Sequence, residues 1–136
     1  GVVAVASGAG IETVFSELGV DVVVSGGQTQ NPSTNDFLDA FAQINAEHIF
    51  VFPNNGNILL AARQAAEIYT DATIHVLESK DLGAGYVAVS SMDLNEQDVD
   101  AILVALPHDL HYECGMFFVA WIEVNDLHTE AFEWRL

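Results

Sequence analysis

The feature that most constrains the fold is an alternation between short apolar runs and longer stretches with helical spacing. Continuous apolar runs are typical of buried parallel strands, whereas apolar residues three and four positions apart mark one face of a helix. Short polar links, often with glycine, separate the two kinds of segment. The strand candidates are residues 2–6, 20–24, 49–52 and 73–77, and the helix candidates are residues 11–18, 35–44 and 58–69.

This alternation predicts a single α/β domain with a mainly parallel sheet of four or more strands and right-handed crossovers. After the fourth strand we expect a polar loop over residues 78–85, and residues 86–90 fit either a helix or a strand. An acidic helix is expected from near Asn95 to Leu106, where Pro107 ends it. The aromatic tail, residues 108–136, is expected to be β-rich, with a hairpin around Asn125.

The composition fits a folded domain. A chain of 136 residues with 51% hydrophobic residues can bury a core and is not a disordered segment. No apolar run reaches membrane-spanning length, so no membrane insertion is expected. The single cysteine, Cys114, fits a reducing, cytoplasmic compartment. Because Gly1 stands where an initiator Met would be, we expect the chain to be a fragment of a longer multidomain protein.

The charge of the chain is extreme. Three basic residues face 20 acidic ones, which gives a formal net charge of −17. Nucleic acids and anionic membrane surfaces are bound through clustered Lys and Arg, so neither is an expected partner. Two interpretations stay open: the charge keeps the protein soluble, or it attracts a basic partner protein.

Polar residues gather in the loops that follow the first three strands. The carboxyl ends of parallel strands meet at one edge of the sheet, where open α/β sheets bind ligands. Hydroxyls, amides and helix N-termini at that edge favour a carboxylate or phosphate, although the same residues also cap helices and fill turns. Lys80 is the basic residue nearest to these loops. The candidate ligand-binding residues are Ser7, Gly8, Gly26, Gly27, Thr29, Asn31, Ser33, Thr34, Asn54, Asn55 and Asn57.

A group of possible metal ligands stands in the tail. His108, His111 and Cys114 lie within seven residues, with His128 further on, and zinc accepts such ligands. Their spacing is not that of a standard finger, so no metal ligand is predicted. The sequence has no Gly-x-Ser-x-Gly nucleophile motif and offers no acid–base pair that can be named, so no catalytic residue is predicted.

Several short motifs, in one order and spacing, resemble a known family. They are VAVASG at 3–8, GGQT at 26–29, NPST at 31–34, PNN at 53–55, NI at 57–58, AA at 61–62 and QAA at 64–66. Through them residues 1–105 are similar to the carboxyl-terminal region of dihydroxyacetone-kinase-like proteins, which is associated with bacterial fatty acid kinase. The chain departs from the family at Ala9, Gln30 and Gly56, where Glu, Met and Lys are usual.

The resemblance implies a fold like the amino-terminal lobe of DegV-type fatty-acid-binding proteins. In the family, ATP and Mg²⁺ bind to a separate amino-terminal domain, and the reaction phosphorylates a fatty acid carried by such a binding protein. We therefore expect no cofactor in this domain and no enzyme activity from the chain alone, although its parent protein would be a kinase. The implied partner is the fatty-acid-binding protein or the parent's own kinase domain.

Three hypotheses for the function follow. The first is a non-catalytic interaction or scaffold module that supports assembly or docks the acyl-carrying partner. The second is a lipid or small-carboxylate binding domain that uses the strand-end loops, with a fatty acid as its ligand. The third is a zinc-binding regulatory domain. A homodimer is compatible with each of them.

Overall fold

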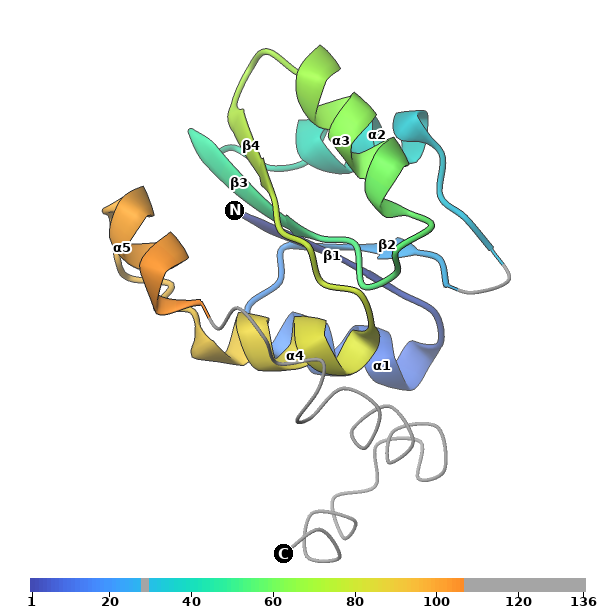
Figure 1. Ribbon diagram of the computed structural model, residues 1–136, viewed down its shortest axis with the longest axis horizontal. Helices are drawn as coiled ribbons and strands as arrows, with labels where there is room; N and C mark the ends of the chain where they lie inside the picture. The colour runs from blue at the N-terminus through green and yellow to red at the C-terminus, as the bar shows by residue number, and fades with distance from the viewer. Residues whose placement is uncertain (28–29, 107–136) are drawn as a thin grey trace, which may run out of the picture.

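The computed structural model describes residues 1–27 and 30–106. In this part of the chain, strands and helices alternate from the N-terminus to β4 and two further helices follow (Figure 1). The elements are β1 (Val2–Ala6), α1 (Ala9–Glu17), β2 (Val22–Ser25), α2 (Thr34–Ala42), β3 (His48–Phe52), α3 (Leu59–Ile68), β4 (Thr73–Val76), α4 (Leu82–Ser91) and α5 (Val99–Ala105).

The four strands form one sheet in the order β2-β1-β3-β4, and every neighbouring pair is parallel. Figure 1 shows α2 and α3 on one face of this sheet and α1 and α4 on the other. The predicted parallel α/β architecture is therefore confirmed. Its polar strand-end loops all lie at one edge, because the strands run in the same direction.

The central strand β1 explains why its sequence is apolar throughout. Val3 and Val5 belong to the core on the α2 and α3 face, while Val2, Ala4 and Ala6 belong to the core on the opposite face. A strand that is covered on both faces has no solvent-facing positions, so alternation with polar residues disappears. The aromatic side chains of Phe37 and Phe41 fill the first core, and those of Phe15 and Phe52 fill the second.

The structure corrects two predicted boundaries in the second half of the chain. Residues 78–85 are not a loop throughout, because α4 begins at Leu82 and includes Gly83 and Gly85. The carboxylate of Asp81 starts this helix by accepting a hydrogen bond of 2.7 Å from the Ala84 N–H. The ambiguous residues 86–90 are helical.

The acidic helix α5 begins at Val99 and not near Asn95. The Asp98 carboxylate caps it by accepting a hydrogen bond of 3.0 Å from the Asp100 N–H. The predicted β-rich tail, residues 108–136, lies outside the described residues. None of the helices in the described part is long and apolar enough to cross a membrane.

Candidate functional site

A pocket of about 670 Å³ lies at the carboxyl edge of the sheet. The loops that follow all four strands contribute to it, and we call it the strand-end pocket. The predicted ligand-binding residues that line it are Ser7, Gly26, Gly27, Asn54, Asn55 and Asn57. The structure thus brings together residues from three loops that are far apart in the sequence, as the parallel topology predicts.

Other predicted residues take structural roles or lie away from the pocket lining. Ser33 caps α2 in a reciprocal pair with Asp36: the Asp36 N–H donates to Ser33 Oγ over 3.2 Å, and the Ser33 N–H donates to Asp36 Oδ2 over 2.7 Å. The Ser33 N–H, and after it the Ser33 hydroxyl, donate to the Asp36 carboxylate and hold the pKa of this carboxyl below its usual value. The hydroxyl of Thr34 donates to Gln64 Oε1 over 3.1 Å and so links α2 to α3.

Gly8, Asn31 and Thr29 complete the predicted set. Gly8 precedes α1 with a φ of 111°, which favours glycine, and its carbonyl accepts a hydrogen bond from the Glu12 N–H at 3.0 Å. Asn31 is exposed and does not line the strand-end pocket. Thr29 lies outside the described residues. A binding role for the eleven candidates stays a prediction.

Asn54 lines the strand-end pocket and joins neighbouring segments through hydrogen bonds. Its Nδ2 donates to the Val5 carbonyl over 2.9 Å, and its backbone N–H donates to Ser79 Oγ over 3.0 Å. The residue is only 6% exposed and has a φ of 58°. Its buried Oδ1 has no hydrogen-bond partner in the described part of the chain and lies against Gly85. Asn54 therefore connects β1, the loop after β4 and α4, and its Nδ2 donor is already engaged within the protein.

The helix ends around the pocket favour an anionic group. Neither α1 nor α3 has a side-chain hydrogen bond at its N-cap, whereas α2 and α4 are capped by Ser33 and Asp81. Ile11 in the first turn of α1 and Ile58 at the start of α3 line the pocket, so both uncapped N-termini border it. Free N–H groups at a helix N-terminus carry partial positive charge.

Lys80 adds a full positive charge to the pocket lining. Arg63, the other basic residue in the described part, forms a salt bridge with Glu78. Asp81 also lines the pocket, and its carboxylate accepts the hydrogen bond that caps α4. The candidate residues did not include Lys80 and Asp81 because both follow the fourth strand, although the rule that strand-end loops share an edge applied to this loop as well.

The sequence of this domain matches a known protein family. The family model for the FakA-like C-terminal domain of fatty acid kinases matches residues 1–112. The chain belongs to this family. Its match spans every described strand and helix together with the strand-end pocket.

Individual proteins show the same likeness. Protein YloV of Bacillus subtilis is 41% identical over 97 residues, which are 71% of this chain and 17% of the relative. An uncharacterised protein of Staphylococcus saprophyticus is 40% identical over 92 residues, or 68% of this chain and 16% of its own length. One from Staphylococcus aureus is 38% identical over 102 residues, or 75% and 18%. The chain thus spans about one sixth of the length of these relatives.

Potential metal ligands are dispersed in the described part of the chain. Within residues 1–27 and 30–106, no three or more His, Cys, Asp or Glu side chains gather in a way that could hold a metal ion. The histidines and the cysteine weighed for zinc in the sequence, from His108 to His128, lie outside this part. A zinc site in the tail stays an untested alternative.

Proposed function

We propose that this chain is a non-catalytic interaction module of a FakA-like fatty acid kinase protein. In this proposal it supports the assembly or docks the acyl-carrying partner, a DegV-type fatty-acid-binding protein. Membership of the C-terminal family and the small share of the relatives that the chain covers support a module of a larger protein. ATP and Mg²⁺ would then bind elsewhere in the parent protein.

The observation that carries the docking proposal is an apolar pair on α3. Leu60 is 66% exposed and Ile68 is 59% exposed, at the two ends of the same helix. Burying two large aliphatic side chains stabilises a contact by about 1.5–3 kcal/mol each when burial is complete. Because the two residues are eight positions apart, they lie toward one side of the helix and suit a protein surface that runs along it.

The docking proposal predicts a specific loss of affinity. The double variant Leu60→Ser, Ile68→Ser should bind a DegV-type fatty-acid-binding protein at least about tenfold more weakly than the parent chain, since about 1.4 kcal/mol corresponds to a factor of ten. Isothermal titration of the purified full chain with the purified partner measures this.

A matched control is Val104→Ser on α5, because Val104 is 79% exposed and also aliphatic. This variant should keep the parent affinity. If the double variant and the unsubstituted chain bind the partner with equal affinity, α3 is not part of the interface. If the unsubstituted chain does not bind the partner at all, the docking proposal is wrong.

A second candidate function is binding of a small carboxylate or fatty acid head group in the strand-end pocket. The specific observation in its favour is the meeting of Lys80 with the uncapped N-termini of α1 and α3 at one pocket. Hydrogen-bond donors of this kind bind anions because the helix N–H groups point outward and carry partial positive charge.

This second candidate predicts a fatty acid adduct. Native mass spectrometry of the chain with palmitate should show one bound molecule, and Lys80→Gln should reduce its occupancy several-fold because a charge-assisted contact contributes about 1.5–3 kcal/mol. Arg63→Gln, which removes the other described basic residue, should leave the occupancy unchanged. A bare mass at every palmitate concentration would reject the pocket as a fatty acid site while leaving the α3 docking proposal intact.

A further inference from the structure

Two histidines from neighbouring strands face each other away from the strand-end pocket. His48 begins β3, and His75 lies in β4, where it pairs in register with Phe50. Because side chains alternate along a strand, His48, Phe50 and His75 share one face of the sheet. Nδ1 of His48 lies 3.1 Å from Nε2 of His75, and the ring centroids are 5.3 Å apart. The two nitrogen atoms are therefore the closest polar atoms of the pair.

The pair is held by its surroundings. The ring of His75 stacks on Phe50 with centroids 4.9 Å apart and an interplanar angle of 20°. Phe50 is only 4% exposed, so it is a fixed platform for the imidazole. Burial, and after it the neighbouring His48, lower the pKa of His75 from its ordinary value.

The nitrogen separation suits two ligands of one metal ion. Imidazole nitrogens bind a divalent ion such as Zn²⁺ at about 2.0–2.1 Å, so two of them in adjacent coordination positions lie about 3 Å apart. The observed separation of 3.1 Å between the two nitrogens agrees with this value. To bind a common ion, both rings would have to turn so that their lone pairs no longer point at each other, and the ion would replace the hydrogen bond that now joins the two nitrogens.

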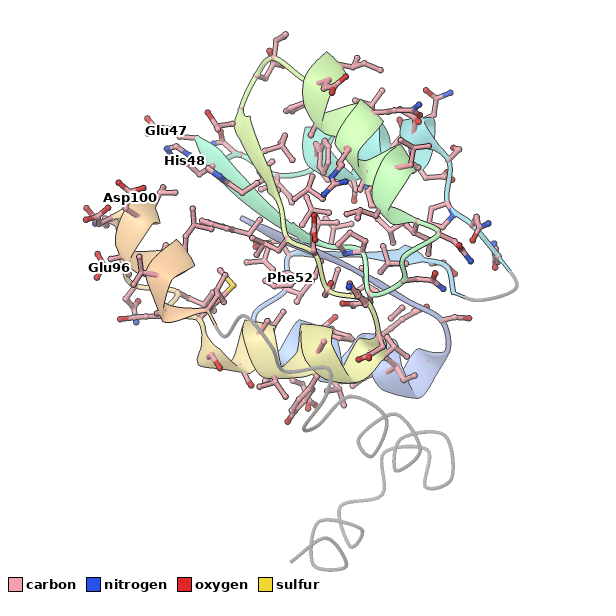
Figure 2. The ribbon with its side chains drawn as sticks, viewed as in Figure 1. Glu47, His48, Phe52, Glu96 and Asp100 are labelled. Atoms are coloured by element: carbon pink, nitrogen blue, oxygen red, sulfur yellow. The ribbon has the colours of Figure 1, made fainter. Side chains whose placement is uncertain are left out.

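The electrostatic setting also favours a cation. His48 lines a pocket of about 470 Å³ together with Glu47, Asp93 and Glu96. Figure 2 shows His48 and Glu47 at the start of β3, with Glu96 and Asp100 on the α5 side of the same end of the sheet. The Lys and Arg side chains of the described part lie elsewhere, at the strand-end pocket and in the salt bridge with Glu78, and the N-terminal ammonium of Gly1 at this pocket donates to the His48 carbonyl. Clustered negative charge raises the local concentration of cations.

We propose that His48 and His75 form a two-histidine site for a divalent transition-metal ion, with water in the remaining coordination positions. The described residues supply no third protein ligand here, so the ion exchanges readily. Two imidazoles favour the metals at the high end of the affinity order, Ni²⁺, Cu²⁺ and Zn²⁺. This site is separate from the strand-end pocket and does not depend on the proposed function.

A titration of the full chain with Ni²⁺ tests the proposal. The tail histidines and cysteine are first replaced (His108→Ala, His111→Ala, Cys114→Ser and His128→Ala), so that the tail cluster cannot supply the signal. This chain should bind one Ni²⁺, and His48→Gln or His75→Phe should each weaken binding at least tenfold. His75→Phe keeps an aromatic ring on Phe50, and thermal melts without metal establish that each variant is folded.

A spectroscopic measurement identifies the metal ligands directly and does not rely on binding affinity. Electron paramagnetic resonance of bound Cu²⁺ should show two equivalent imidazole nitrogens, and one of these should be lost in His48→Gln. If the tail-replaced chain binds no Ni²⁺, or if both single variants retain its affinity, the two-histidine site is wrong. His48→Gln decides the matter if His75→Phe does not fold.

Discussion

Replacing Gly85 with Ala should lower the free energy of unfolding by about 3 kcal/mol, the upper end of the cost of overpacking a core. A Cβ at position 85 would lie 1.8 Å from Oδ1, 2.5 Å from Cγ and 2.8 Å from Nδ2 of Asn54. The Asn54 side chain cannot move aside without breaking its hydrogen bond to the Val5 carbonyl. The steric cost therefore exceeds the gain of about 1 kcal/mol that Ala gives over Gly in a helix. Urea denaturation followed by circular dichroism measures the difference.

Two comparisons isolate the cause. Gly56→Ala adds the same methyl group where no atom lies within 4 Å, so stability should change by no more than about 0.5 kcal/mol. In an Asn54→Gly background, which keeps the positive φ and removes the obstructing amide, Gly85→Ala should cost much less or become stabilising. A Gly85→Ala penalty that is the same in both backgrounds would show that Asn54 is not the obstacle.

The isosteric change Asn54→Asp should destabilise the fold by about 3 kcal/mol or more near neutral pH, as expected for an uncompensated buried charge. The substitution replaces the Nδ2 donor by an oxygen that faces the Val5 carbonyl, in a side chain that is 6% exposed. Two hydrogen-bond acceptors then face each other, and the buried carboxylate is no longer hydrated. Chemical denaturation at several pH values measures the effect.

The pH dependence distinguishes this mechanism from a general loss of packing. Burial raises the folded-state pKa of the new carboxyl above its unfolded value of about 3.9. The penalty is therefore largest above the raised pKa and shrinks as the pH falls through it, because the protonated carboxyl can donate to the Val5 carbonyl. Asn55→Asp is the matched control, since Asn55 Oδ1 already accepts a hydrogen bond from the Asn57 N–H and a carboxylate can do the same. An Asn54→Asp penalty that does not change with pH would contradict this account.

The candidate site was predictable in its location and less so in its members. Six of the eleven residues chosen from the sequence line the strand-end pocket, because loops after parallel strands share an edge. Ser33 and Thr34 follow the same polar pattern, yet the Ser33 hydroxyl bonds to Asp36 in the first turn of α2 and the Thr34 hydroxyl bonds to Gln64 in α3. A hydroxyl that caps a helix and one that faces a ligand have the same local sequence signature, so the sequence could not separate the two roles.

The sequence by itself determined the parallel α/β sheet and the approximate extent of its strands and of the first three helices. The wholly apolar run of β1 and the helical spacing of apolar residues are local patterns that can be read without knowing which segments pack together. Only the tertiary structure decided that residues 82–91 form a helix with two glycines in its first turns. The glycine at position 85 is explained by the close approach of Asn54, which is distant in the sequence and leaves no room for a Cβ. The facing of His48 and His75 likewise depends on the register between β3 and β4, which no single stretch of sequence encodes.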